Sequence, residues 1–213
     1  MKKIIIANAS EFLFKPKKLF HGRKIINRKK AKENILILRN ILNRTNLRWG
    51  LIFGTLLGAV RENNFITHDE DTDIFIFDED KNKTLDLIHK FRKFGFEIIR
   101  YEKNSLLSIT RDNEYIDFYF FKKTFFGRKC LDYFIPNFFF KRITKIKFIN
   151  KNFPTLNNPK KYLEFQYGKN WRVPKKQAHA KPNIPWKKFV KENFPIAVKI
   201  YHSWKKKLDK KQD

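Results

Sequence analysis

The sequence predicts an α+β fold in which helices pack on a mixed β-sheet. Two apolar patterns indicate it: segments with an apolar residue at every third or fourth position, which is helical spacing, and short continuous apolar runs bounded by turn residues, which are typical of buried strands. These segments follow one another as helix, strand, helix, strand, helix and then several strands. That order excludes an all-helical and an all-β domain.

The first predicted elements are a helix, a strand and a second helix. Residues 27–46 carry apolar side chains at helical spacing with Lys and Arg between them, which is typical of an amphipathic helix. The apolar positions are Ala31, Ile35, Leu38 and Leu42. Residues 48–53 form a short apolar run that predicts a strand ending at Gly54, and residues 55–62 predict the second helix.

The middle of the chain predicts more strands around a third helix. Residues 73–77 (DIFIF) are typical of a buried strand, and residues 81–94 carry apolar residues on one helical face. Gly95 is a favourable residue for the end of that helix. Three strand-like runs follow, separated by turn-prone residues: 96–101, 106–110 and 115–121.

The last third of the chain predicts fewer regular elements. Beyond residue 124 the sequence is irregular, aromatic and basic, until residues 159–167 predict a short helix that starts with Pro and is followed by Gly168. A final basic helix is predicted over residues 186–208. We therefore expect one main domain with an N-terminal helix over residues 1–175, and a basic helical C-terminal extension over residues 176–213.

Composition supports a folded domain and points to anionic partners. The chain has 213 residues, 42% of them apolar and 24 of them Phe, so it can bury a substantial core, and global disorder is excluded. Its 48 Lys and Arg against 21 Asp and Glu give a net charge of +27. Such a surface attracts nucleic acid, anionic lipid and phosphorylated substrates alike, and charge alone does not choose among them.

The expected location is the cytoplasm. The lone Cys130 makes no internal disulfide and lacks the companions of a zinc site, which fits a reducing compartment. Residues 1–7 imitate the start of a signal peptide, but Asn8, Ser10 and Glu11 interrupt the apolar run. Nowhere do about 18 consecutive apolar residues predict a membrane span. The basic charge is also compatible with a peripheral contact at the inner face of an anionic membrane.

Acidic residues concentrate at one point of this basic chain. Asp69, Glu70, Asp71 and Asp73 place four acids within five positions. Because side chains alternate along a strand, Asp71 and Asp73 point to the same side and repel each other unless a cation lies between them. Mg²⁺ (or Mn²⁺) is such a cation and prefers oxygen ligands. The alternative is a solvated turn or strand edge.

A further carboxylate, Asp117, interrupts the apolar run of residues 115–120 (YIDFYF). A lone Asp buried within a strand is costly. The alternative is that Asp117 lies at a strand edge or strand end and faces water. If this strand lies beside the one that carries Asp73, three carboxylates converge and can hold one or two metal ions. Such ions clamp the attacking and leaving oxygens of a phosphoryl transfer.

A glycine turn precedes the acids. Residues 54–61 (GTLLGAVR) follow a predicted strand and open a helix. The backbone N–H groups at this helix start and the hydroxyl of Thr55 would form a phosphate cradle.

The turn and the acids together resemble the LicD family, relatives of the fukutin-type transferases, which are similar to nucleotidyltransferases of the polymerase-beta type. The matching text from Gly54 to Phe77 is GTLLGAVRENNFITHDEDTDIFIF, where the family typically has GTLLGAxR, a loop ending in Ile, then Pro-Trp and an acidic DDDID run. Residues 159–174 (PKKYLEFQYGKNWRVP) resemble the family's C-terminal segment. The chain departs from the pattern at Thr67-His68, which replace Pro-Trp, and at Glu70 and Thr72. By the resemblance, these changes would alter the wall of the pocket beside the metal, and hence the donor or acceptor that the pocket accepts.

The resemblance implies a nucleotidyltransferase-like fold and a CDP-alcohol-dependent phosphotransferase. A phospho-substituent, such as phosphocholine, phosphoethanolamine or a polyol phosphate, would move from a CDP-linked donor to a sugar hydroxyl of a cell-surface glycan, free or lipid-linked, as in lipopolysaccharide or capsule biosynthesis. Asp71, Asp73 and Asp117 would be the catalytic residues, and together with Asp69 the metal ligands. The residues expected at the nucleotide and its phosphates are Gly54, Thr55, Arg61, Trp171 and Arg172.

Alternatives remain open at this stage. A nucleotidyltransferase acting on RNA or a small molecule would use the same aspartates. A non-enzymatic nucleic-acid-binding protein would use the positive charge. Buried carboxylates repel phosphate, which argues against this second alternative, so we expect no specific nucleic acid partner. Arg61 would otherwise form a surface salt bridge, and Trp171 would pack in the core. Phe138, Phe139 and Phe140 would either touch a membrane or fill the core.

Overall fold

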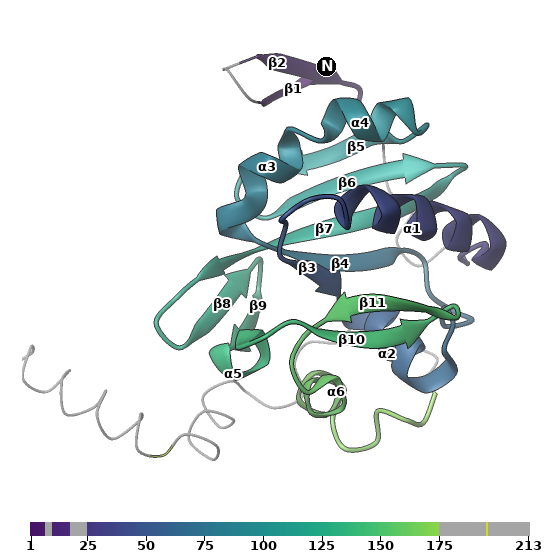
Figure 1. The fold of residues 1–213 in the computed structure, drawn as a ribbon, viewed down its shortest axis with the longest axis vertical. Helices are drawn as coiled ribbons and strands as arrows, with labels where there is room; N and C mark the ends of the chain where they lie inside the picture. Colours follow the sequence, from purple (N-terminus) through teal and green to yellow (C-terminus); the bar gives the residue numbers. More distant parts are fainter. Residues whose placement is uncertain (7–9, 18–24, 175–194, 196–213) are drawn as a thin grey trace, which may run out of the picture. The chain divides into compact units, whose positions relative to one another are not determined.

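A mixed sheet forms the centre of the first of two units into which the chain divides, Met1–Leu163 and Glu164–Asp213 (Figure 1). The computed structural model describes residues 1–6, 10–17, 25–174 and 195. In spatial order, the strands along the sheet are β10 (Thr144–Phe148), β11 (Lys151–Thr155), β3 (Trp49–Leu51), β4 (Thr72–Phe77), β7 (Glu114–Lys123), β6 (Leu106–Arg111) and β5 (Glu97–Glu102). Strands β4 and β7 are parallel neighbours, whereas β3 and β6 flank them in antiparallel orientation.

The two faces of the sheet differ in chemistry because side chains alternate along β7. One face is apolar, with Ile116, Phe118 and Phe120, and the other carries Tyr115, Asp117 and Tyr119. Helix α4 (Ile88–Lys93) covers the apolar face, where the rings of Phe91 and Phe118 lie 5.7 Å apart. Helix α2 (Phe53–Glu62) begins on the other face, where the ring of Phe53 lies 5.0 Å from that of Tyr119. Helices on both faces confirm the predicted α+β class.

The predicted first helix is α1 (Arg28–Leu42), which lies against β7 (Figure 1). Its N-cap is Asn27, whose side chain accepts a hydrogen bond from the backbone N–H of Lys30 at 3.2 Å. All four predicted apolar positions of this helix are buried. The amphipathic pattern therefore placed both the helix and its buried face correctly.

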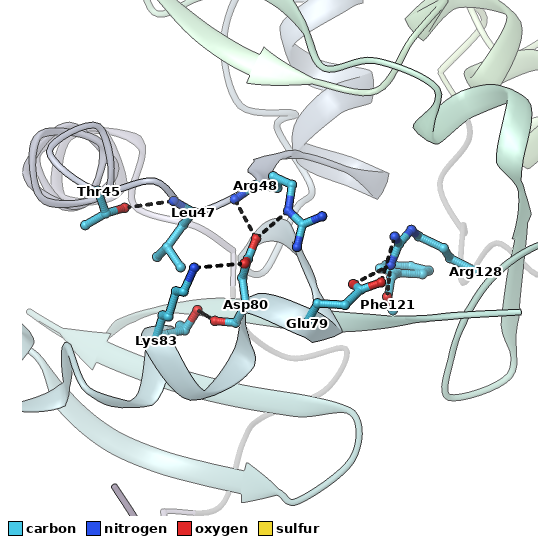
Figure 2. A network of polar contacts seen from close by, with 9 residues as sticks. Thr45, Leu47, Arg48, Glu79, Asp80, Lys83, Phe121 and Arg128 are labelled. Carbon is cyan, nitrogen blue, oxygen red and sulfur yellow. Dashed lines mark hydrogen bonds and ion pairs between the residues drawn. The ribbon is translucent and has the colours of Figure 1, made fainter. Parts of the chain in front are cut away.

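A polar network fixes the end of β4, where the 3₁₀ turn η2 (Asp78–Asp80) follows (Figure 2). Asp80 Oδ2 accepts hydrogen bonds from the backbone N–H of Arg48 at 3.0 Å and from its Nε at 2.7 Å. Arg128 donates to Glu79 Oε2 at 2.8 Å and to the carbonyl oxygen of Phe121 at 2.9 Å. The network therefore joins the residue before β3 to the end of β4, to β7 and to the strand that carries Arg128.

The prediction of one helix over residues 81–94 was wrong. The segment forms two short helices, α3 (Lys81–Leu85) and α4, separated by Asp86 and Leu87. The backbone N–H of Leu87 bonds the carbonyl oxygen of Thr84 at 3.1 Å, three residues back, so the turn is tighter than in an α-helix. The apolar residues of both helices remain buried: Leu85, Ile88 and Phe91.

The prediction of irregular structure beyond residue 124 was also wrong, because this region contains two hairpins. They are β8 (Gly127–Cys130) with β9 (Tyr133–Pro136), and β10 with β11; the short helix α5 (Asn137–Phe140) lies between them. Ile149 and Asn150 connect β10 to β11 with φ values of 47° and 62°. Such turns usually signal themselves by Asn-Gly or Asp-Gly, and a β-branched residue there gives no warning. Phe139 and Phe140 are buried, so they fill the core.

The two ends of the chain were predicted with different success. An N-terminal hairpin of β1 (Lys2–Ile5) and β2 (Glu11–Phe14) was not predicted. Helix α6 (Pro159–Tyr167) has the predicted bounds and is followed by Gly168, whose φ is 86°. The predicted helix over residues 186–208 and the domain boundary at residue 175 are not settled, since most of residues 175–213 lie outside the described residues. In the described part of the chain, no helix is long and apolar enough to span a membrane.

Candidate active site

Two acids from distant parts of the sequence lie side by side on the polar face of the sheet. Strands β4 and β7 pair in parallel with Asp73 directly opposite Asp117, so both side chains project from the same face. Adjacent strands are about 4.8 Å apart. Asp73 is 5% exposed and Asp117 is 2% exposed. The predicted convergence of the carboxylates requires these two strands to be neighbours, and they are.

Asp69 and Asp71 lie close enough to these acids to interact with them electrostatically. Burial, followed by the charges of Asp73, Asp117 and Asp69, raises the pKa of Asp71 well above its ordinary value. Burial, followed by Asp69 and Asp117, does the same to the pKa of Asp73. Burial also raises the pKa of Asp69 to about 7. The four predicted metal ligands therefore form one electrostatic cluster.

The glycine turn holds this cluster directly. A Cβ built on Gly54 would lie 2.8 Å from Asp69 Oδ2, so only glycine lets the Asp69 carboxylate lie this close to the start of α2. The backbone N–H of Gly54 also hydrogen-bonds the Asp73 carboxylate, which favours its ionised form. The buried hydroxyl of Thr55 accepts a hydrogen bond from the backbone N–H of Asp73 at 2.8 Å. The structure thus places Gly54 and Thr55 against the acids, and their contact with a phosphate stays a prediction.

The glycine turn and the acid cluster lie within a matched family domain. Residues 46–176 match the family model described as LicD/FKTN/FKRP, nucleotidyltransferase domain. The chain belongs to the LicD family. This membership confirms the resemblance seen in the sequence and assigns the fold to the nucleotidyltransferase type.

Individual relatives of this LicD-family chain are distant. It is 28% identical over 167 residues to human "Ribitol-5-phosphate transferase FKTN", a match covering 70% of this chain and 34% of that protein. It is 29% identical over 113 residues to an uncharacterised protein of Rickettsia typhi, covering 52% of this chain and 30% of that one. The chain thus spans about a third of the length of these relatives. A crystal structure of the lincosamide antibiotic adenylyltransferase LnuA, bound to lincomycin, superposes with a TM-score of 0.45 at 12% identity, over 62% of this chain and 84% of that one.

A strained residue starts helix α2 of the LicD domain. Phe53 has φ of 46°, the left-handed region that bulky residues rarely adopt. Its ring packs against Tyr133 at 4.5 Å and Tyr119 at 5.0 Å between centroids. This packing offsets the backbone strain at Phe53. The conformation of Phe53 in turn directs the N–H of the next residue, Gly54, toward Asp73.

Three tyrosines and an arginine at this site were not predicted from the sequence. Burial, followed by the carboxylates, raises the pKa of Tyr115, Tyr119 and Tyr133, and the Tyr119 hydroxyl hydrogen-bonds Asp73. Tyr115 and Tyr119 flank Asp117 at spacing two, a signal that could have found them. Tyr133 comes from the unpredicted hairpin β8–β9. Arg100 on β5 donates to Asp117 Oδ2 at 2.7 Å.

The remaining predicted residues lie in two places. Arg61 donates to Glu62 Oε1, from Nε at 3.0 Å and from Nη2 at 2.6 Å, and its charge also lowers the pKa of Asp69, against the larger effect of burial. Arg61 therefore forms a salt bridge, the alternative to phosphate binding, and it also lies close enough to the acid cluster to stabilise the ionised form of Asp69. Trp171 and Arg172 belong to the second unit, where the Arg172 guanidinium lies 4.2 Å from the centre of the Trp171 ring. Their predicted contact with the nucleotide stays a prediction.

The chemistry of the acid cluster fits a hard divalent cation. Carboxylate oxygens are the ligands that Mg²⁺ prefers, and the charges of these carboxylates raise one another's pKa, which a cation would relieve. Asp69 Oδ2 is buried and has no hydrogen-bond partner among the described residues. Within the described ranges, no three or more His, Cys, Asp or Glu side chains lie in an arrangement that would itself hold a metal ion. A bound metal therefore stays a proposal that the donor chemistry supports.

Proposed function

We propose that this protein transfers a phospho-substituent from a CDP-linked donor to a sugar hydroxyl of a cell-surface glycan, with the help of a divalent cation. The observation that carries the proposal is the in-register pair of Asp73 and Asp117 on adjacent parallel strands. Membership of the LicD family supports it, and so does the similarity to a protein named as a ribitol-5-phosphate transferase. The substituent would be a polyol phosphate, phosphocholine or phosphoethanolamine.

The residues of the acid cluster share one task in this reaction, and Asp117 has a second. Asp69, Asp71, Asp73 and Asp117 would hold Mg²⁺ or Mn²⁺, which would neutralise charge that develops on the phosphoryl oxygens. The acceptor hydroxyl oxygen bonds to the distal phosphorus of the donor, the bond between that phosphorus and the bridging oxygen breaks, and CMP leaves with the electron pair. Asp117 accepts the proton of the attacking hydroxyl. The N–H of Gly54 and the hydroxyl of Tyr119 hold the Asp73 carboxylate in place.

Mass spectrometry of reaction products tests this function. The protein is incubated with MgCl₂, a panel of CDP-alcohols (ribitol, glycerol, choline and ethanolamine) and an oligosaccharide acceptor. We expect free CMP and an acceptor heavier by one phospho-alcohol. Asp71→Asn should abolish both products, whereas Asp112→Asn should not, because Asp112 lies exposed in the turn between β6 and β7, where its φ of 53° suits Asn.

The product also separates the nucleotidyltransferase alternative. A nucleotidyl group on the acceptor, with no phospho-alcohol, would replace our proposal by that activity. A cytoplasmic location, and a peripheral contact with the inner face of an anionic membrane where a lipid-linked acceptor would lie, stay predictions drawn from composition and charge.

A further inference from the structure

A row of polar side chains crosses four strands on the face that carries the acids. The register pairs Asp73 on β4 with Asp117 on β7, Asp117 with Ser108 on β6, and Ser108 with Arg100 on β5. Directly opposite residues in a sheet share a face, so these four side chains form a continuous line. Asp73, Asp117 and Ser108 are buried. Buried polar groups are costly unless they are paired, so a row of them needs a reason.

A β-bulge puts Arg100 into this row. On β5, Ile98 pairs with Ile109 and Arg100 pairs with Ser108, so Ile99 is an extra residue in the strand. Without the bulge, Ile99 would oppose Ser108 and Arg100 would project from the opposite, apolar face. Bulges are frequent next to active sites, where they redirect a side chain. The carbonyl oxygen of Ile99 accepts a hydrogen bond from the backbone N–H of Lys17 at 3.1 Å, which secures the bulge.

Arg100 is held at one edge and open at the other. Its Nε donates to Ser108 Oγ at 3.0 Å and one Nη donates to Asp117 Oδ2 at 2.7 Å. A guanidinium has five N–H donors in a fixed fork, and the others donate to nothing within the described ranges. The side chain is 26% exposed. The guanidinium is thus positively charged, held in orientation by two hydrogen bonds, partly exposed, and left with donors for a further ligand beside the acids.

We propose that Arg100 forms a phosphate-binding subsite for the distal phosphate of the donor. This inference rests on the proposed function, because it assumes a donor whose second phosphate lies at the acid cluster. Arginine matches phosphate oxygens with two parallel N–H bonds, and Ser108 and Asp117 keep its fork from turning away. Balancing the charge of Asp117 explains the bulge, but it requires neither the fork of a guanidinium nor the donors that remain after the bonds to Ser108 and Asp117.

Binding of CDP and CMP tests the subsite, because the two probes differ only in the second phosphate. Affinities are measured by calorimetry in MgCl₂ for the wild type, Arg100→Gln and Arg100→Lys. Gln keeps hydrogen-bonding capacity toward Ser108 and Asp117 but carries no charge. We expect Arg100→Gln to weaken CDP binding by about ten- to a hundredfold and to change CMP binding less than about twofold. Arg100→Lys should lie between.

The control is Arg111→Gln. Arg111 is on the neighbouring strand β6, is 27% exposed and binds Asn34 and Asp112. The Arg111→Gln variant should bind CDP like the wild type. The subsite would be overturned if Arg100→Gln lost CDP and CMP affinity equally, or if its CDP affinity were unchanged. If Arg100→Gln fails to fold, the same comparison of CDP and CMP affinity in Arg100→Lys decides. If the wild type turns over CDP-alcohols in these cases, the proposed function stands. If the wild type neither binds CDP nor turns over any CDP-alcohol, the proposed function itself has failed.

Discussion

Thr55 is the residue that most directly positions the backbone of Asp73. Its buried hydroxyl accepts the Asp73 N–H at 2.8 Å. Thr55→Val keeps the shape but leaves that N–H without an acceptor, so we expect the free energy of unfolding to fall by about 1–3 kcal/mol. Thr55→Ser keeps the oxygen and should cost less. Urea denaturation of the three proteins measures this, and a Thr55→Val variant as stable as the wild type would contradict the contribution of the hydrogen bond.

We expect the Asp73 carboxylate to destabilise the protein when no metal is bound. Burial and the charges of Asp69 and Asp117 raise its pKa, so its ionised form is unfavourable without a cation. Asp73→Asn removes one of the repelling charges, and we expect its melting temperature in EDTA to exceed that of the wild type by a few degrees. MgCl₂ should stabilise only the wild type, and turnover of the variant should fall by about 10²- to 10³-fold. Thermal scans with and without MgCl₂ test both; a variant that responds to MgCl₂ like the wild type contradicts the assignment.

At the scale of elements, two glycines decide how closely the loop from 63 to 71 lies against α2. A Cβ on Gly58 would lie 2.4 Å from the backbone oxygen of Asn64, whereas a Cβ on Gly54 would meet the Asp69 carboxylate. A backbone yields less easily than a side-chain end. We therefore expect Gly58→Ala to destabilise the fold by about 1–3 kcal/mol, and Gly54→Ala to fold with similar stability but lose turnover, because the Asp69 carboxylate must move.

These two glycine variants control each other in one set of denaturation and turnover measurements. If Gly58→Ala lost turnover without losing stability, the loop packing described for it would be wrong.

The Asp80 network ties the segments before β3 and after β4 and should make stability depend on pH (Figure 2). Burial opposes ionisation of Asp80, but the hydrogen bonds from Arg48 outweigh it and lower its pKa. A carboxyl whose pKa is lowered on folding stabilises the protein fully above its unfolded pKa of about 3.9, and this contribution is lost as pH falls through the folded pKa. Asp80→Asn should therefore cost about 1–3 kcal/mol at pH 7 and progressively less below about pH 4.

Chemical denaturation at several pH values measures the difference between wild type and Asp80→Asn. The matched control is Asp132→Asn, since Asp132 lies exposed in the turn between β8 and β9. A cost for Asp80→Asn that stays constant from pH 7 to pH 3 would disprove the ionic contribution.

For the whole molecule, the net charge of +27 predicts nonspecific association with polyanions. Binding of a random RNA oligonucleotide should weaken by about 10³-fold or more between 50 and 200 mM salt, because neutralised phosphates release their counterions. It should persist in Asp71→Asn, since the charge and not the acid cluster carries it. Fluorescence anisotropy measures both. Sequence-selective RNA binding that needs Asp71 would instead favour the nucleotidyltransferase alternative.

Local patterns in the sequence determined the family, the order of most elements and the identity of the acids. Helical spacing in residues 27–46 and the DIFIF run could be read because each element's buried face repeats with its own period. Asp117 could be singled out because a charge in an apolar strand needs compensation. The buried helical face of Leu85, Ile88 and Phe91 could also be predicted from the sequence, but the break between α3 and α4 at Asp86 could not.

Tertiary structure alone decided which groups meet. Pairing of β4 with β7, and thus Asp73 beside Asp117, joins segments about forty residues apart, and no local periodicity encodes such a register. One extra residue in β5 reverses the face on which Arg100 projects, and a hairpin without a turn signature brings Tyr133 to Phe53. The chemistry of a side chain is a property of its own residue. Whether two side chains meet depends instead on the face of the strand that each one occupies and on which strands pair, and only the folded chain establishes both.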